Sequence, residues 1–275
     1  MPRQFEVVTA GPPPVWASLR NEAERAARDE PTLGSLLNAV ILSHHRIEEA
    51  LSYQFARKIG DQELRAMSAR EIALEAYEAD PSLIAAAEAD LKAVFERDPA
   101  CKGYVQPFLF FKGFQALQTH RVAHWLWTHS RDTLAFYLQS KMSEVFQVDI
   151  HPAARIGSGI FFDHGTGIVI GETATVGDDV SIMHGVTLGG TGAERGDRHP
   201  KIGRGVLLSA GAKVLGNITV GDYAKVAAGS VVLKNVPSHC TAAGVPARLI
   251  NCPTCDEPAR TMDHTLSDEI YDYVI

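Results

Sequence analysis

The sequence lacks three features that would place it in other classes of protein. It has no long basic run, and its formal net charge is -7 at pH 7, so nucleic acid is not an expected partner. No apolar run of about 18 residues is present, so we expect no transmembrane helix. The N-terminal stretch MPRQFEVVTAGPPPVW has no apolar core of signal-peptide length. These absences predict a soluble cytoplasmic protein without a membrane partner.

Cysteine is also scarce, with four residues in 275: Cys101, Cys240, Cys252 and Cys255. So few cysteines, mostly late in the chain, do not suggest a disulfide framework. Cys252 and Cys255 form the lone motif CPTC, without a second pair or a βαβ context. We therefore expect two free thiols there rather than a zinc or redox site.

Glycine is sparse in the first half of the chain and abundant in the second, where 18 of the 23 glycines lie between Gly157 and Gly244. The first half contains helical patterns instead. A helix with a capping box at Ser68 and Glu71 ends before Pro81, and another runs from there to Pro99. Two apolar stretches follow, PFLFFKGFQALQTHRVAHWLWTHS, with its weak point at Gly113, and TLAFYLQSKMSEVFQ. We expect a disordered N-terminus (1–14) and a helical domain (15–145).

The second half repeats an aliphatic residue every six positions. Three registers, the second shifted by two from the first, contain Ile150, Ile156, Phe162 and Ile168; Ile170, Val176, Ile182 and Leu188; and Ile202, Leu208, Val214, Val220, Val226 and Val232. Strands of a β-sandwich recur every 8–12 residues instead. Short strands with tight turns fit the period, because each aliphatic side chain then stacks on its equivalent one coil away. The pattern predicts a parallel β-helix over residues 146–250, followed by a flexible tail (251–275).

The six-residue period stops once, in LGGTGAERGDRHPKIG between Leu188 and Gly203. The interval from Leu188 to Ile202 equals two hexapeptides plus two residues. Long loops in compact domains are usually functional, and Arg198, next to His199, suits paired hydrogen bonds to a carboxylate or phosphate. We expect this loop to leave the coil and to serve a site, the alternative being a solvated loop with incidental charges.

Several motifs resemble the serine O-acetyltransferase family: DIHPAARIG, DHGTGIVIGETA, VTLGGTGAERGDRHPKIG, SAGAKVLGNITVG and AAGVPARLI, with RDPA and FKGFQALQTHRVAHWLW upstream. Many acyltransferases share the hexapeptide period, whereas the combination of DIHPAA, DHGTG and GDRHPKI is specific. The resemblance covers about residues 15–250 and the last few residues. It implies a left-handed β-helix and transfer of acetyl from acetyl-CoA to L-serine by direct attack, the first step of cysteine biosynthesis. Acetyl-CoA is then a co-substrate, and neither a cofactor nor a metal is expected.

The resemblance also implies roles for individual residues. Acetylation of a hydroxyl needs a base, and it assigns this role to His164 with Asp149 as the partner of its second nitrogen. The substrate ammonium would meet Asp98 and Asp163, and the substrate carboxylate would meet Arg198 and His199, which also steadies the reacting centre. Without the resemblance, Asp98 is simply an acidic residue that ends a helix before a proline.

The pantetheine arm of acetyl-CoA would lie along the β-helix, since no P-loop or GxGxxG is present. The resemblance implicates the small residues Gly190, Ala210, Gly211 and Ala228, with Lys225 near the phosphates. Coil corners need small residues in any case, so the alternative is purely structural.

Family members form trimers through the β-helix and pair these trimers through the helical domain, so a homotrimer or a dimer of trimers is implied. L-cysteine is implied as a feedback inhibitor, although His184 and Gly185 in MHGVTLGG depart from the family pattern and leave that sensitivity open. The acidic tail MDHTLSDEIYDYVI ends in Ile275. A terminal Ile in this family inserts into O-acetylserine sulfhydrylase; the alternative is a frayed tail.

Two readings from other classes stay open. Hexapeptide β-helices also build a zinc carbonic anhydrase, for which His164, His184 and His199 could be ligands. That enzyme requires a close His-x4-His pair in the coil region, which this chain lacks. The third reading is a non-catalytic partner protein, for which the acidic tail would provide an interaction segment.

Overall fold

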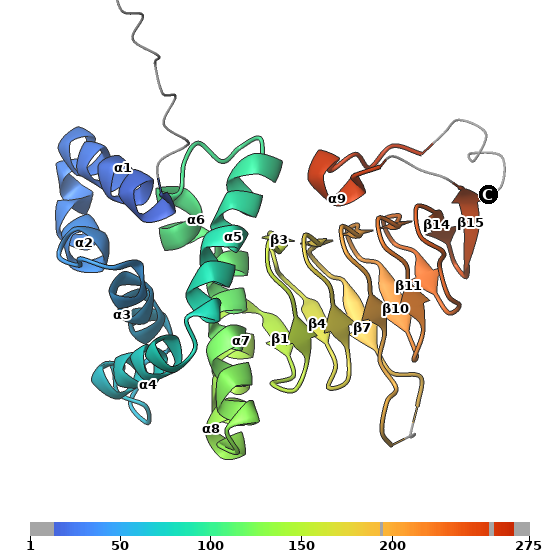
Figure 1. Ribbon diagram of the computed structural model, residues 1–275, viewed down its shortest axis with the longest axis horizontal. Coiled ribbons are helices and arrows are strands. Elements are labelled where there is room, and N and C mark those ends of the chain that lie inside the picture. The colour runs from blue at the N-terminus through green and yellow to red at the C-terminus, as the bar shows by residue number, and fades with distance from the viewer. Residues whose placement is uncertain (1–13, 193–194, 253–255, 267–275) are drawn as a thin grey trace, which may run out of the picture.

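The computed structural model describes residues 14–192, 195–252 and 256–266, and its helical first half is followed by a parallel β-solenoid (Figure 1). The α-helices of the first half are α1 (Val15–Asp29), α2 (Gly34–Leu37), α3 (Ile47–Ile59), α4 (Ala66–Ala79), α5 (Ser82–Arg97), α6 (Val105–Phe110), α7 (Lys112–Thr128) and α8 (Asp132–Phe146). This arrangement confirms the predicted helical domain and parallel β-helix. Within the described ranges, no helix has the length and apolarity to cross a membrane.

Two details of the helical half differ from the prediction. Helix α4 begins at Ala66 and has no side-chain cap, so the predicted capping box of Ser68 and Glu71 is wrong. The long apolar stretch is broken at Phe111, whose extended backbone separates α6 from α7. Gly113 lies inside α7, where a Cβ would be 2.2 Å from the carbonyl oxygen of Phe162. Glycine therefore allows α7 to approach the solenoid closely.

The solenoid has three sheets, which we call A, B and C, and their strands are parallel except for the pairing of the last strand. Sheet A contains β1 (Val148–Ile150), β4 (Ile168–Ile170), β7 (Thr187–Gly189), β10 (Lys213–Leu215) and β13 (Val231–Val232). Sheet B contains β2 (Arg155–Ile156), β5 (Thr175–Val176), β8 (Lys201–Ile202) and β11 (Thr219–Val220). Sheet C contains β3 (Phe161–Asp163), β6 (Ser181–Met183), β9 (Leu207–Leu208), β12 (Lys225–Val226), β14 (Thr241–Gly244) and β15 (Ala247–Asn251).

The periodic aliphatic residues stack in register inside the solenoid. In sheet A, successive strands align Ile150, Ile170, Leu188, Val214 and Val232, and all five are buried. Each coil thus adds one layer to a continuous apolar core, and burial of these layers is the main stabilising contribution.

The coils differ in length at two places. In sheet A, Asp149 pairs with Val169, Val169 with Thr187, Thr187 with Lys213, and Lys213 with Val231. The second and fourth of these steps have the ordinary length of three hexapeptides. The first step carries two extra residues and the third carries eight. The loop after Leu188 is therefore one six-residue step with an insertion, and the smaller insertion falls between β3 and β4.

A buried ion pair fastens the helical half to the first coil. The Asp90 carboxylate, on α5, accepts from the Nη2 of Arg121 (2.7 Å) and from the backbone N–H of Ile160 (2.9 Å). Arg121 Nη2 also donates to the carbonyl of Gly157 (2.8 Å). Asp90 lies on α5 and Arg121 lies on α7, and each side chain contacts the first coil. The two contacts together fix the orientation of the helical half relative to the solenoid.

The chain turns back on itself after the last coil. Strand β15 pairs antiparallel with β14, which brings the Cα atoms of Cys240 and Cys252 to 4.4 Å, and a disulfide joins them. The expected free thiol at Cys252 is therefore wrong, because this hairpin lies beyond the hexapeptide pattern. Cys255 lies outside the described residues. Helix α9 (Pro258–Thr261) then lies over the outer face of sheet C (Figure 1).

Candidate active site

His164 stands at the corner between sheets C and A, within the smaller of the two insertions. Strand β3 ends at Asp163, and the next two residues are the extra ones of the first coil. The backbone of His164 has a left-handed φ of 58°, and the following Gly165 also has a positive φ. The side chain of His164 is 71% exposed. The insertion therefore lifts an imidazole out of the coil, where it can accept a proton from a ligand.

The predicted partner of His164 lies nearby but is bonded elsewhere. Asp149, on β1, accepts from the Nε2 of Gln139 (2.7 Å). The corner of His164 lies against β1, since a Cβ on Gly165 would be 3.5 Å from Val148. Among the described side chains, no hydrogen bond joins Asp149 to His164. The pair stays a prediction, and Gln139 is a neighbour that the sequence did not indicate.

Two carboxylates face the same corner. Asp163 Oδ1 lies 3.7 Å from His164 Nε2. Burial raises the pKa of Asp163, the His164 charge opposes that shift, and the charge of Asp98 adds to it. Asp98 is therefore close to Asp163, although the two lie far apart in sequence. Adjacent carboxylates whose charges repel favour a bound cation such as an ammonium group.

The inserted loop ends in Arg198 and His199 at a different corner, between sheets A and B. Arg198 Nη2 donates to Oε2 of Glu172 (2.8 Å), and this guanidinium holds the pKa of Glu172 below its usual range. Thr173 anchors the loop, because its Oγ1 accepts from the backbone N–H groups of Arg198 and His199 (both 3.1 Å). Sequence reasoning did not indicate that Glu172 or Thr173 contacts the loop.

His199 is buried beneath the end of the loop. Its Nδ1 accepts from the backbone N–H of Thr173 (3.2 Å), so the neutral ring carries its proton on Nε2 and can donate there. Burial, followed by the Arg198 charge, lowers the pKa of His199. Nε2 lies over Gly171, where a Cβ would be 2.0 Å away. Because Gly171 has no Cβ, the His199 ring can occupy this position.

The predicted residues thus form two groups on one chain. Asp98, Asp163 and His164 meet at the corner of sheets C and A, whereas Arg198 and His199 lie at the corner of sheets A and B. Over the described part of the chain, no hydrogen bond or ion pair connects these two groups.

A column of small residues continues the His164 corner along the solenoid. Gly167, Gly185, Gly211 and Gly229 occupy equivalent positions; a Cβ on Gly185 would be 3.4 Å from the Cα of Gly211. Thr166, His184 and Ala210 precede three of these glycines and bond the next coil through their carbonyls, and Ala228 stands in the corresponding place. Gly190 instead lies in the loop, beside the Arg198 side chain.

Lys225 lies beneath the C-terminal segment. It is 6% exposed, and its Nζ donates to the carbonyl of Thr265 (2.7 Å). Ile275 lies outside the described residues. In the ranges that the structure covers, no group of three or more His, Cys, Asp or Glu side chains could hold a metal ion. His164 and His184 lie 5.6 Å apart, ring to ring, and His199 is on another corner.

Family patterns match parts of both halves of the chain. The family pattern "Serine acetyltransferase, N-terminal" matches residues 15–119, and "Bacterial transferase hexapeptide (six repeats)" matches residues 199–234. The serine acetyltransferase of Salmonella typhimurium is 54% identical over 249 residues, or 90% of this chain and 91% of the relative.

Solved structures of serine acetyltransferases have the same fold. One in complex with cysteine has a TM-score of 0.91 and 51% identity, covering 92% of this chain and 98% of that one. The Brucella abortus enzyme in complex with coenzyme A has a TM-score of 0.87 and 53% identity (89% and 97% covered). The soybean enzyme complexed with serine has a TM-score of 0.84 and 56% identity (86% and 97% covered). With this identity along nearly its whole length, the chain belongs to the serine acetyltransferase family.

Proposed function

We propose that this protein is a serine O-acetyltransferase, which converts acetyl-CoA and L-serine to O-acetyl-L-serine and CoA at the start of cysteine biosynthesis. The observation that carries the proposal is the exposed imidazole of His164 beside two carboxylates, at the head of a column of small residues. The solved relatives with serine and coenzyme A support both substrates.

The chemistry follows from the basicity of an exposed imidazole. His164 Nε2 accepts the proton of the serine hydroxyl while the serine oxygen attacks the thioester carbonyl carbon. The tetrahedral intermediate then expels the CoA sulfur, which receives that proton from the imidazolium. A carboxylate stabilises the positively charged imidazolium ring. Asp149 can do so once it gives up its hydrogen bond from Gln139 and accepts one from Nδ1 of His164. No acyl-enzyme forms.

The two ends of serine need opposite charges. Asp98 and Asp163 bind the ammonium, and their mutual repulsion is relieved when the cation arrives. Arg198 and His199 bind the carboxylate, for which Arg198 must release Glu172. The acetyl donor lies along the corner column at Ala210, Gly211 and Ala228, and it requires that Thr265 release Lys225.

Because these two groups occupy different corners of one chain, the complete site forms between chains. A threefold arrangement of solenoids places the loop of one chain at the His164 corner of the next, which gives a trimer. Pairing through the helical half would make a dimer of trimers. Sedimentation at several protein concentrations would tell these states apart.

Two further interactions belong to this proposal. L-cysteine resembles serine closely enough to compete for the acceptor site, and a relative is known with cysteine bound. The terminal Ile275 would bind O-acetylserine sulfhydrylase. A cytoplasmic location stays a prediction that cell fractionation would check.

The test is thiol release from acetyl-CoA by purified protein with L-serine, L-homoserine, a galactoside or no acceptor, each with and without EDTA. We expect release that depends on serine and that EDTA does not change. Thiol release with another acceptor alone would show that the protein transfers acetyl groups to a substrate other than L-serine. Loss of release with EDTA would favour the metal alternative, and no release with any acceptor would favour a non-catalytic partner protein.

A further inference from the structure

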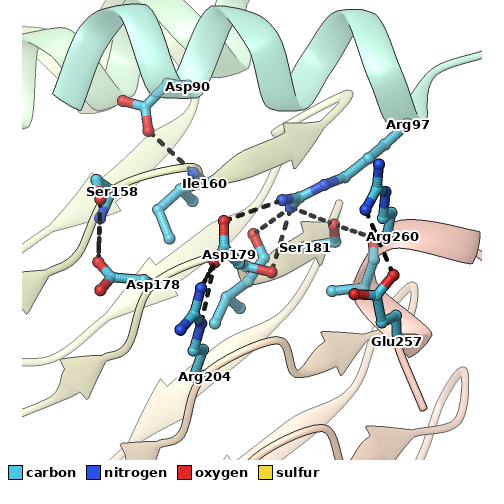
Figure 2. Close-up of polar contacts among 12 residues, drawn as sticks. Asp90, Arg97, Ser158, Ile160, Asp178, Asp179, Ser181, Arg204, Glu257 and Arg260 are labelled. Atoms are coloured by element: carbon cyan, nitrogen blue, oxygen red, sulfur yellow. Dashed lines mark hydrogen bonds and ion pairs between the residues drawn. The ribbon is translucent and has the colours of Figure 1, made fainter. Parts of the chain in front are cut away.

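Arg97 is a buried cation that directly precedes Asp98 at the end of α5. Only 8% of the residue is exposed, and burial lowers its pKa, although the nearby Asp179 carboxylate opposes this shift. Figure 2 shows the guanidinium reaching from the helix to the corner between sheets B and C in the second coil. A buried charge is stable only when its hydrogen-bond partners are well placed, so its position is closely specified.

The partners of Arg97 lie in the turn that follows β5 and in the first residue of β6. Nη1 lies 3.3 Å from the carbonyl oxygen of Asp179, 3.5 Å from that of Val180 and 3.2 Å from Ser181 Oγ. Nη2 lies 3.6 Å from the Asp179 carboxylate. Arg204 Nη2 holds the same carboxylate from the other side at 2.7 Å (Figure 2). The planar guanidinium suits several acceptors at once, whereas the point charge of a lysine does not.

We call the contacts of Arg97 with Asp179, Val180 and Ser181 the Arg97 clamp. The clamp connects the two carboxylates of the acceptor site. Asp98 ends α5 with its N–H bonded to the Val94 carbonyl (3.0 Å), and its carboxylate caps the N–H of Ala100 (2.8 Å). Asp163 lies on β3, whose neighbour β6 begins at Ser181 and aligns Met183 with Asp163. Arg97 therefore ties the helix that carries one carboxylate to the strand beside the other.

The C-terminal helix α9 closes the clamp. Ser181 Oγ, which accepts from Arg97, donates its own proton to the carbonyl of Ala259 (2.7 Å). Arg260, next along α9, forms an ion pair with Glu257 (3.5 Å) beside the same turn (Figure 2). One hydroxyl thus links Arg97 and the C-terminal segment.

We propose that Arg97 is a positioning residue that sets the spacing of Asp98 and Asp163, and that α9 secures this setting through Ser181. The inference rests on the proposed function, in which these carboxylates bind the ammonium of serine. Loss of the clamp lets the end of α5 move, so the carboxylates no longer converge on one cation. The effect falls on recognition of the amino group rather than on proton transfer at His164.

The test compares R97Q with wild-type protein in steady-state acetyl transfer. We expect KM for L-serine to rise about tenfold, equivalent to about 1.4 kcal/mol, while KM for acetyl-CoA and kcat at saturating serine change little. The preference for L-serine over 3-hydroxypropanoate, which lacks the amino group, should shrink by a similar factor. S181A should change the same two quantities in the same direction but less, and R97K should restore them only in part.

R204Q is the matched control, because Arg204 shares the Asp179 carboxylate but is exposed, and within the described residues it makes no hydrogen bond or ion pair with α5. Its serine KM and its acceptor preference should stay within about twofold of wild type. Thermal unfolding is measured for every variant, and R97K and S181A decide the matter if R97Q does not fold. Folded variants with unchanged serine KM and preference, or with equal losses for both acceptors, would overturn the inference. Absence of serine-dependent release in the wild type would instead overturn the proposed function.

Discussion

At the scale of single residues, His164 marks a small insertion in an otherwise regular coil. The two added residues place the imidazole outside the coil, with a backbone φ that ordinary corner residues avoid unless they are glycine or a few polar types. The sequence contained the signal, since the interval from Phe162 to Ile170 is two longer than the period. The bond from Gln139 to Asp149 could not be predicted, because it joins side chains from a helix and a strand without a shared pattern.

Replacement of this imidazole is the direct check of its role. H164A should lower kcat/KM by about 10² or more, because the serine hydroxyl loses its base. The exposed side chain contributes little to packing, so the melting temperature and the oligomer should be unchanged. H184A serves as the control, since His184 lies beside His164 on the next coil and the proposed mechanism assigns it no proton transfer. A near-native rate for H164A would remove it as the base.

At the scale of elements, the larger insertion leaves the repeat of the coil before and after it unchanged. The break in the period predicted that the loop leaves the coil, and the structure shows an insertion into a single step. Thr173 and Glu172, which hold its end, could not be inferred, because they belong to the preceding coil and only the solenoid brings them under the loop. Sequence periodicity reports which positions stack; it does not report what an inserted segment touches.

The two groups of site residues give a prediction about mixed oligomers. H164A and R198A damage different groups, so each should be nearly inactive alone. When the two are unfolded together and refolded as mixed oligomers, some sites combine an intact His164 from one chain with an intact Arg198 from the next. We expect a substantial part of the wild-type activity to return, measured as serine-dependent thiol release. Refolded mixtures that stay as inactive as the single variants would show that both groups must come from one chain.

At the scale of the whole molecule, the division into a helical half and a solenoid was predictable from glycine content and hydrophobic period. The junction was not, since the contacts of Asp90 and Arg121 with Ile160 and Gly157 depend on how the two halves dock. The hairpin that joins Cys240 to Cys252 was missed for a similar reason, because it reverses the chain beyond the repeat.

Buried histidines make the stability of the molecule depend on pH. His120 is 2% exposed, and its pKa lies well below the ordinary value of 6.5 because of burial and then His124. Below about pH 6.5, His120 binds a proton in the unfolded chain but stays neutral in the folded protein, so the free energy of unfolding falls as the pH drops. H120F should flatten this loss between pH 6.5 and pH 5 by up to about 1.4 kcal/mol per pH unit.

The measurement is urea unfolding of wild type and H120F at several pH values. H45Q is the control, because His45 is exposed and its replacement should leave the wild-type slope. An H120F slope equal to that of wild type would show that folded His120 takes up its proton as readily as the unfolded chain.

The tail gives a prediction that separates partner binding from catalysis. Deletion of Ile275 should abolish binding to O-acetylserine sulfhydrylase while acetyl transfer stays at the wild-type rate, because every residue proposed to act in acetyl transfer precedes Leu266. Isothermal titration with the full-length and truncated chains would measure the difference. Unchanged affinity would make the end of the chain an ordinary tail.

The stacked coils have a consequence for the length of the acetyl donor. In sheet C, three inter-strand steps separate the strand of Asp163 from that of Lys225, through Ser181 and Leu207. At about 4.8 Å per step the two strands lie about 14 Å apart. In the proposed site, the interval between the thioester and the phosphates of the acetyl donor must match this distance. Insertion of one more coil would increase the distance by one inter-strand step of about 4.8 Å.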